Sequence, residues 1–269
     1  MGPNSVSDVS VVIPCFNSSA TLERAVASVA AQTELPREVI VVDDGSTDDT
    51  VSVAHALAVA HPRLNVSVVS LGENVGPGTA RNVGWDRASH AFVAFLDADD
   101  AWHPRKLEIQ GAAMAGAPQC AVSGHRYRVD ESGSLGELGT ERPAVKHVTL
   151  RSLLVKNAFS TPSVMLRRDI AQRFNPSRDM TEDYLLWMEI VAGHGPALLV
   201  DAPLATLFKA PYGESGLSSQ LHRMERKELN ALRFMRRSGL ISTPTWAWAA
   251  LWSLIKYVRR IVVVAIRSR

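Results

Sequence analysis

The first hundred residues alternate between short apolar runs and longer segments of helical spacing, and no other feature constrains the fold as strongly. Short runs rich in Val and Ile predict buried strands, and apolar residues three and four positions apart predict helices between them. The strands are expected at Val9–Ile13, Glu38–Val42, Leu64–Ser70 and Ala91–Leu96, and the helices at Thr21–Ala31, Ser46–Val59 and Pro77–Ala88. Residues 46–49 resemble a capping box at the start of the second helix. The alternation favours right-handed crossovers and a parallel sheet with helices on both faces.

A polar or turn-forming cluster follows each of these strands. The clusters are Pro14–Asn17, Asp43–Ser46, Glu73–Gly78 and Asp97–Asp100. The carboxyl ends of parallel strands share one edge of a sheet, and ligands of such sheets bind outside that edge. The four clusters are therefore expected to converge on one ligand site.

The fourth cluster, Asp97-Ala98-Asp99-Asp100, offers up to three carboxylates. Alternation along a strand would send Asp97 and Asp99 to the same side. Mg²⁺ and Mn²⁺ prefer oxygen ligands and commonly share them with substrate phosphates. The cluster therefore predicts a metal site, with a solvated acidic turn that caps a helix as the alternative.

The segments after the second and third strands indicate a nucleotide. Asp43 and Asp44 end a buried strand, where carboxylates accept hydrogen bonds from a base or a ribose, and Gly45 permits a tight turn. The segment Asn74–Gly84 places Arg81 and several glycines around a helix start, where backbone N–H groups suit a pyrophosphate. Its glycine spacing is not the dinucleotide fingerprint. Turn and cap chemistry alone is the alternative for each segment.

Beyond Asp100 the pattern loosens, and the expected elements are a helix at Arg105–Ala115, a strand at Cys120–Val129, a mobile loop at Ser132–Arg142, a helix at Val148–Val155, a strand at Ser163–Arg167, a helix at Thr181–Ala192, and extended structure at Leu198–Phe208 broken by Pro203.

The two cysteines, Cys15 and Cys120, show no metal-ligand spacing. They are expected to be reduced thiols in the core of a cytosolic protein.

The charge is divided between an acidic body and a basic tail. From Leu217 onward 11 Lys/Arg stand against two Glu, whereas the remainder carries 18 Lys/Arg against 25 Asp/Glu. An acidic body suits metal chemistry, and a basic tail suits an anionic surface. We therefore divide the chain into a main domain, residues 1–216, and a basic amphipathic helical tail, residues 217–269.

The tail predicts two helices, Leu221–Arg237 and Thr245–Arg269. The longest uncharged run of the second, Trp246–Ile255, is too short to span a bilayer. Its tryptophans and cations instead suit a helix lying in a membrane interface, and packing against the domain or a second subunit is the alternative. A helical wheel groups four cations of this helix on one side, namely Lys256, Arg259, Arg260 and Arg267.

Five segments, taken together and in order, resemble glycosyltransferase family 2. They are VSVVIPCFNSSATLERAVASVAAQT, VIVVDDGSTDDT, NVGPGTARNVG, FVAFLDADDAWHPRKLEIQ and TEDYLLWMEI, and the resemblance covers about residues 8–215. It implies the GT-A fold, a Rossmann-like, mostly parallel α/β sheet with helices on both faces, here followed by the helical tail. It also implies an inverting, hexosyltransferase-type enzyme that uses a nucleotide-diphosphate sugar, most often a UDP-sugar, and Mn²⁺ or Mg²⁺.

The resemblance also implies roles for individual residues. Asp97 and Asp99 match the family's DXD metal motif, and Asp100 is a third candidate ligand. The residues expected around the base and ribose are Pro14, Asn17, Asp43 and Asp44, with Asp44 as the uracil partner.

The segment Thr181-Glu182-Asp183 matches the acidic motif that supplies the family's catalytic base. Inversion requires one carboxylate to take a proton from the acceptor hydroxyl, on the face opposite the departing UDP. We assign this role to Asp183, and we expect Glu182 to position it or the acceptor. The alternative for the pair is an acidic first turn that stabilises a helix.

The leading hypothesis is an enzyme bound peripherally to the cytoplasmic face of the cell membrane that extends a surface glycan. Its expected partners are the nucleotide-sugar donor, a glycan or lipid-linked saccharide acceptor and an anionic membrane surface, without nucleic acid. One alternative is a polyprenyl-phosphate sugar synthase, but such members usually carry DADLQ-like residues where this chain has DADD followed by Ala-Trp. The other is a nucleotide-sugar-binding protein without turnover, which the intact carboxylate pairs disfavour.

Overall fold

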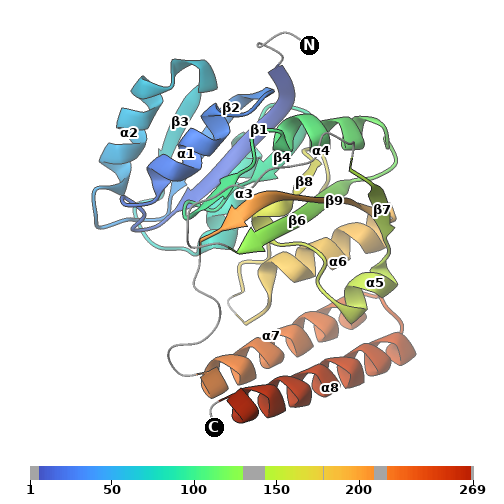
Figure 1. Ribbon diagram of the computed structural model, residues 1–269. Helices are drawn as coiled ribbons and strands as arrows, with labels where there is room; N and C mark the ends of the chain where they lie inside the picture. Colours follow the sequence, from blue (N-terminus) through green and yellow to red (C-terminus); the bar gives the residue numbers. More distant parts are fainter. Residues whose placement is uncertain (1–5, 130–142, 178, 209–216, 268–269) are drawn as a thin grey trace.

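The computed structural model describes residues 6–129, 143–177, 179–208 and 217–267 (Figure 1). The loop predicted at Ser132–Arg142 lies outside these residues. All other elements predicted from the sequence lie within them, apart from the last two residues of the tail.

The first half of the chain has the predicted alternation of strands and helices. Its elements are β1 (Val6–Cys15), α1 (Leu22–Ala30), β2 (Leu35–Asp43), α2 (Thr50–Ala60), the 3₁₀ turn Pro62–Leu64, β3 (Val66–Ser70), α3 (Pro77–Arg87) and β4 (Phe92–Phe95). The four strands pair in parallel in the order β3-β2-β1-β4. Their carboxyl ends therefore meet at one edge, as the sequence predicts.

The start of α2 differs from the prediction. The helix begins at Thr50, and the residues read as a capping box belong to the loop before it. The Ser46 hydroxyl accepts from the N–H of Asn17, and the Asp48 carboxylate accepts from the N–H groups of Ser19 and Thr50. These side chains bind the neighbouring loop, so the helix starts only after them.

The second half extends the sheet with a mixture of strand directions. Its elements are β5 (Asp100–Trp102), α4 (Lys106–Ala115), β6 (Val122–Val129), β7 (Val145–Val148), α5 (Leu150–Val155), the 3₁₀ turn Thr161–Ser163, β8 (Met165–Arg167), α6 (Glu182–His194) and β9 (Ala197–Leu207). The order continues from β4 as β8-β6-β9-β5, and β7 pairs with β9. The strand β8 runs antiparallel to both β4 and β6.

The sequence pattern missed two short strands and misread one long one. The strands β5 and β7 are too short to show a period, and each pairs with β9. The expected break at Pro203 is absent, because β9 runs through it. An irregularity in the β6–β9 pairing lies where Arg126 faces Pro203. Such a bulge accommodates the missing N–H of proline.

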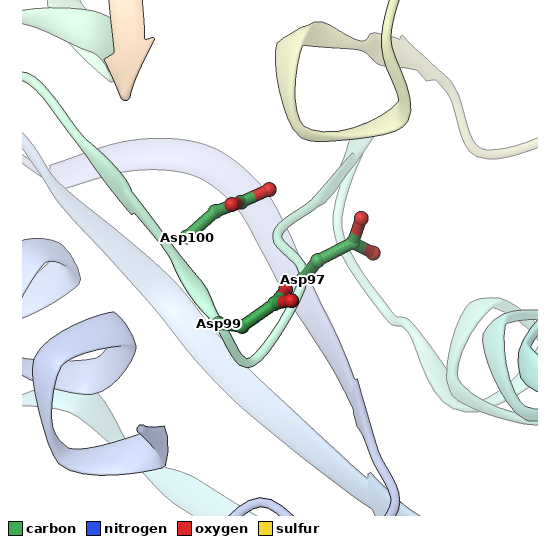
Figure 2. Close-up of side chains that lie close together, drawn as sticks. All are labelled: Asp97, Asp99 and Asp100. Carbon is green, nitrogen blue, oxygen red and sulfur yellow. The ribbon is translucent and has the colours of Figure 1, made fainter. Parts of the chain in front are cut away.

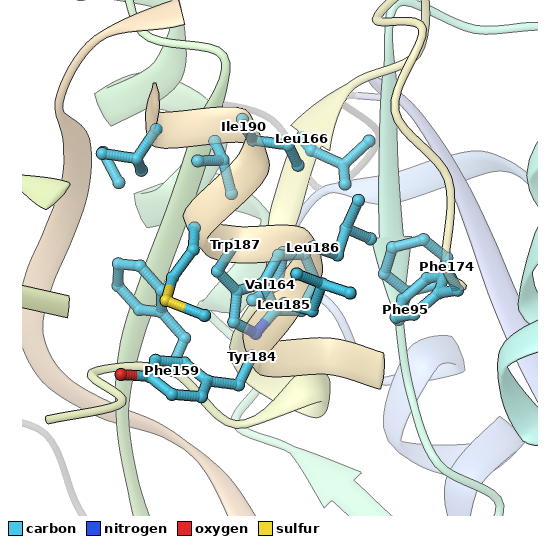
Figure 3. Close-up of a cluster of buried hydrophobic side chains, with 14 of the residues drawn as sticks. Phe95, Phe159, Val164, Leu166, Phe174, Tyr184, Leu185, Leu186, Trp187 and Ile190 are labelled. Carbon is cyan, nitrogen blue, oxygen red and sulfur yellow. The ribbon is translucent and has the colours of Figure 1, made fainter. Parts of the chain in front are cut away.

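The sheet is covered on both faces by separate hydrophobic clusters. One cluster joins it to α1, α2 and α4, and the other joins it to α3, α5 and α6. The second cluster centres on α6, whose Tyr184, Leu185 and Trp187 lie against the sheet (Figure 3). Phe174 packs edge-to-face against Phe95 and Trp187, with ring centroids 5.2 and 5.8 Å away. Both cysteines are free and buried.

The tail forms a helical hairpin of α7 (Leu217–Arg237) and α8 (Thr243–Arg267), beneath α5 and α6 in Figure 1. Ala231, Met235 and Ala249 of this hairpin belong to the same buried cluster as α6. The domain boundary at residue 216 stays a prediction. No helix in the described ranges is long and apolar enough to cross a bilayer.

The cations that the helical wheel groups on one side of α8 do not all face solvent. Lys256 pairs with Glu228 of α7 at 2.8 Å and donates to the backbone oxygen of Val155. Arg260 is half-buried, and Arg259 is exposed. The side chain of Arg267 is not among those described. The buried carboxylates of α7 explain the inward cations, because a buried charge requires a partner.

Candidate active site

A cleft of about 500 Å³ opens at the carboxyl edge of the parallel strands. This volume lies within the range typical of small-molecule sites. Six residues singled out from the sequence line it, namely Pro14, Asn17, Asp44, Arg81, Asp97 and Asp99. Cys15 also lines the cleft, but burial and the nearby Asp43, Asp48 and Asp44 raise the pKa of its thiol to about 12, so it stays protonated. The predicted convergence of strand ends therefore produces one cleft.

Asp43 and Asp44 hold the loops that form one wall of the cleft. The carboxylate of Asp44 accepts from the N–H groups of Val75 and Gly76, at 2.8 and 2.9 Å. The carboxylate of Asp43 is buried and accepts from Ser46 and Ser70. A carboxylate has about four acceptor positions. These bonds thus leave Asp44 acceptor capacity toward the cleft while fixing its orientation.

Two residues in the left-handed region shape the same wall. Asn17, with φ of 49°, accepts through its amide oxygen from the N–H of Thr47 and so ties the loop after β1 to the loop after β2. Gly45 has φ of +73°, and a Cβ there would lie 2.6 Å from the backbone of Glu73. Only glycine fits this position without strain. The hydrogen bond of Asn17 and the turn at Gly45 thus hold the loops of this wall against one another.

The acidic cluster forms a tight turn rather than a strand end. The N–H of Asp100 donates to the backbone oxygen of Asp97 at 3.0 Å, which closes the turn between β4 and β5. Arg24 of α1 donates to the backbone oxygen of Asp99 at 2.6 Å. The side chains of Asp97, Asp99 and Asp100 project from this one turn (Figure 2). The turn, and not strand alternation, brings the three carboxylates together.

The carboxylates of Asp97, Asp99 and Asp100 fit a divalent cation. Each offers an oxygen, and these oxygens lie within 4.8 Å of one another. An all-oxygen donor set beside an open cleft suits Mg²⁺ or Mn²⁺, which keep further positions for water and substrate phosphates. Asp99 and Asp97 also line the cleft, so a cation between them would face its contents.

Arg81 lies between the acidic turn and the start of α6. Its guanidinium donates to Asp97 at 2.6 Å and to Glu182 at 3.4 Å, and its side chain is only 8% exposed. Burial alone would lower the pKa of Arg81, but the charges of Asp97, Glu182 and Asp183 raise it. The sequence suggested a pyrophosphate contact for this residue. The structure shows that Arg81 also joins two carboxylate sets that are far apart in the sequence.

Glu182 and Asp183 begin α6 in a half-buried position. Burial raises the pKa of Glu182, and the charge of Arg81 opposes this shift. Burial also raises the pKa of Asp183, opposed by its hydrogen bond from the N–H of Tyr184 and by Arg81. A carboxylate with a raised pKa accepts protons more readily. Both residues thus have the chemistry of a base, and within the described part of the chain Asp183 has no direct ion pair like that of Glu182 with Arg81.

Glu182 also lies against Gly78, a contact that the sequence does not signal. The backbone N–H of Gly78, in the first turn of α3, lowers the pKa of the Glu182 carboxyl. A Cβ at Gly78 would lie 2.3 Å from Glu182 Oε2, so any other residue there would displace this carboxylate. From the sequence, the backbone N–H of Gly78 was expected to face a pyrophosphate. No local pattern signals a contact between residues this distant along the chain.

The parallel half-sheet, the cleft and the acidic turn together define a nucleotide-sugar transferase of the GT-A type. A model described as "Glycosyl transferase family 2" matches residues 10–174, more than half of the chain. The chain belongs to that family.

Curated relatives support the same assignment. WfgD of Escherichia coli, named as a UDP-Glc:alpha-D-GlcNAc-diphosphoundecaprenol beta-1,3-glucosyltransferase, is 29% identical over 68% of this chain and 69% of its own length. TuaG of Bacillus subtilis (strain 168), provisionally named as a teichuronic acid biosynthesis glycosyltransferase, is 42% identical over 68% of this chain and 71% of its own. The succinoglycan biosynthesis protein ExoO of Rhizobium meliloti (strain 1021) is 43% identical over 44% of this chain, and the match spans only 33% of ExoO.

Solved structures share the fold at low sequence identity. TarS 1-349 of S. aureus, in complex with UDP-GlcNAc, has a TM-score of 0.67 at 21% identity and covers 91% of this chain and 71% of its own. The mannosyltransferase PcManGT of Pyrobaculum calidifontis, in complex with GDP-Man and Mn²⁺, has a TM-score of 0.66 at 18% identity, covering 100% of this chain and 83% of its own. Both matches are long enough to extend beyond the sheet into the tail.

Proposed function

We propose that the chain transfers a sugar, with inversion, from a UDP-sugar to a hydroxyl of a lipid-linked saccharide during surface polysaccharide synthesis. One observation carries the proposal. Arg81 joins Asp97 of the acidic turn to Glu182 beside Asp183, so the donor-side and acceptor-side carboxylates flank a single centre. The names of WfgD and TuaG, a UDP-glucose enzyme and a polysaccharide enzyme, support the donor and the pathway class.

The proposed reaction uses the two carboxylate sets differently. Asp183 takes the proton of the acceptor hydroxyl while that oxygen bonds to the anomeric carbon. The bond from this carbon to the diphosphate oxygen breaks, and its electron pair leaves with UDP. Asp97, Asp99 and Asp100 would hold Mn²⁺ or Mg²⁺, which neutralises charge developing on the leaving diphosphate. Glu182, fixed by Gly78 and Arg81, positions the base.

The donor and metal assignments predict that the donor stabilises the protein only when the metal is present. A screen of UDP-, GDP- and dTDP-sugars should find stabilisation by a UDP-sugar only with Mn²⁺ or Mg²⁺, about 3 kcal/mol at a hundredfold excess over Kd. The Asp99→Ala variant should lose this metal-dependent gain but keep its fold, since Asp99 lies at the rim. Asp169→Ala, at an exposed turn, is the matched control. If calorimetry with metal present gives the same donor affinity for the wild type and for Asp99→Ala, Asp99 is not part of the metal site.

The outer face of α8 supports the proposed peripheral binding to the inner face of an anionic membrane. Its Ser253 and Lys256 turn inward, and both acidic residues of the hairpin, Glu225 and Glu228, are buried or nearly so. On α8 itself, Arg259 is exposed and Arg260 is half-buried. Among the described side chains, the outer apolar row is Leu251, Leu254, Ile255, Val258, Ile261 and Val262, all at least 42% exposed. Apolar residues with a surplus of cations suit an interface of anionic lipid.

The exposed apolar residues of α8 are the ones whose mutation should weaken membrane binding. Leu251, Val258 and Val262 are 59%, 58% and 50% exposed, so Gln at all three should leave the fold intact. Each loses about 1 kcal/mol of burial in lipid, and the triple variant should bind anionic vesicles roughly a hundredfold more weakly. Vesicle flotation measures this. Activity on a short soluble acceptor should not change.

The control for the tail variant is Val59→Gln, because Val59 is an 83% exposed valine on α2. It should float with anionic vesicles as the wild type does. A triple variant that still floats normally would contradict membrane binding through this face. If size-exclusion chromatography shows that the triple variant instead dissociates an oligomer, the face is a subunit interface.

A further inference from the structure

One face of α7 carries a basic row that the reaction proposed above does not use. Arg223, Arg226, Lys227 and Asn230 are spaced i, i+3, i+4 and i+7, so they share one side of the helix. Another side of the same helix carries Ala231, Leu232 and Met235, which are buried in the core. The basic row is therefore held in place by the packing of the helix.

A cavity of about 270 Å³ lies over this row. Its lining residues are Asp179, Arg223, Arg226 and Lys227. It shares no lining residue with the nucleotide cleft. Within the described ranges, none of its three cations forms an ion pair with a carboxylate. The volume is below that of typical drug-sized pockets and suits a small charged group.

The cavity is connected to the segment that carries the acceptor-side carboxylates. Asn230 donates to the backbone oxygen of Asp179 at 3.1 Å, which ties α7 to the segment that leads into α6. That segment reaches Glu182 and Asp183 within four residues. The charge of Lys227 also lowers the pKa of Glu182, against the larger effect of burial. A group held in the cavity would thus lie beside the segment that carries Glu182 and Asp183.

We propose that the Arg223–Arg226–Lys227 cavity binds the phosphate or diphosphate group of the lipid-linked acceptor. Arginine side chains match phosphate oxygens with paired N–H donors, and lysine adds a mobile charge. The proposal rests on the proposed function, because it needs an acceptor that carries such a group. It adds a second anion site, separate from that of the donor diphosphate. The cavity would bind the acceptor through its phosphate or diphosphate group, while the hydroxyl of the acceptor sugar reaches Asp183.

The test measures anion binding to the full chain by calorimetry. The probes are inorganic pyrophosphate, farnesyl diphosphate and uncharged farnesol, in EDTA so that no divalent cation holds diphosphate in the nucleotide cleft. Arg223→Gln/Arg226→Gln should weaken binding of both diphosphates at least about tenfold. Arg223→Lys/Arg226→Lys should retain most of the affinity, because the charge remains. Arg233→Gln/Arg237→Gln removes two exposed cations of the same helix outside the cavity, and it should bind like the wild type.

Each outcome decides a separate point. Tighter binding of farnesyl diphosphate than of pyrophosphate would support a lipid-linked group as the ligand. If the two bind equally and farnesol does not bind, the cavity is a site for free anions, and its role in acceptor binding is overturned. Equal affinity of wild type and the 223/226 Gln variant, or an equal loss in the 233/237 control, would overturn the site. Binding of UDP with Mn²⁺ is measured in parallel and should be unchanged in every variant. Failure of the wild type to bind UDP would reject the donor assignment instead, whatever the anion result.

Discussion

Asp183→Asn should lower turnover by roughly 10²–10⁴, the usual contribution of a general base. The substitution keeps the size of the side chain and most of its hydrogen bonds but cannot accept the acceptor's proton. Binding of the UDP-sugar should survive, because Asp183 does not line the nucleotide cleft. Steady-state assays of UDP release, with donor binding by calorimetry, measure the two effects separately.

The pH profile gives a second reading of the same residue. Burial and the nearby Asp97 charge raise the pKa of Asp183, while Tyr184 N–H and Arg81 oppose them. A base acts only when deprotonated, so kcat/KM should fall as pH decreases through a pKa above the ordinary value of about 3.9. Glu189→Gln, six residues further along α6, is the control and should leave the acid limb unchanged. Near-normal turnover of Asp183→Asn would move the role to Glu182.

Arg81→Met should destabilise the protein by about 3 kcal/mol at neutral pH, because it removes the cation between three partly buried carboxylates. We take the lower end of the range for broken buried pairs, since Asp97 and Glu182 are 19% and 28% exposed. The melting temperature should fall by roughly 6–12 °C. Protonation of the carboxylates removes their repulsion, so the difference from wild type should shrink as pH is lowered.

The matched control for this variant is Arg105→Met. Arg105 pairs with Glu108 at 2.9 Å, but both side chains are about one-third exposed. Such surface pairs contribute about 0–1 kcal/mol. Arg81→Lys should recover part of the stability but not both contacts, because lysine cannot bridge two carboxylates as a guanidinium does. Equal loss of stability in Arg81→Met and Arg105→Met would mean that the buried network has no special weight.

The sequence predicted the parallel half of the fold because its signals are local. The strand β2 contains the continuous apolar run Val39–Val42, and Pro77 stands at the first position of α3, where proline is favoured. The mixed half was harder to predict. The strand β5 has three residues and exists because β9 pairs with it, and the irregularity at Pro203 depends on β6. Such features are set by partners distant in the sequence.

The candidate site likewise combines residues that could be predicted from the sequence and contacts that could not. The residues that end strands, such as Asp44 and Asp97, were predicted from position alone, and they line the cleft. The bridge made by Arg81 and the contact of Gly78 with Glu182 join α3 to α6 across the fold. The face of α8 could not be assigned correctly from its wheel. The wheel shows which cations share a side of α8, but it does not show that Lys256 pairs with Glu228 of α7 and therefore faces inward.

The most direct test of the central claim is the anomeric configuration of the transferred sugar. The full chain would be incubated with the UDP-sugar selected by the stability screen, a prenyl-diphosphate-linked saccharide in detergent, and Mn²⁺ or EDTA. The product linkage would be read by NMR. We expect transfer only with the metal, one UDP released per sugar transferred, and a configuration opposite to that in the donor. Transfer in EDTA at the same rate, or retention of configuration, would contradict it.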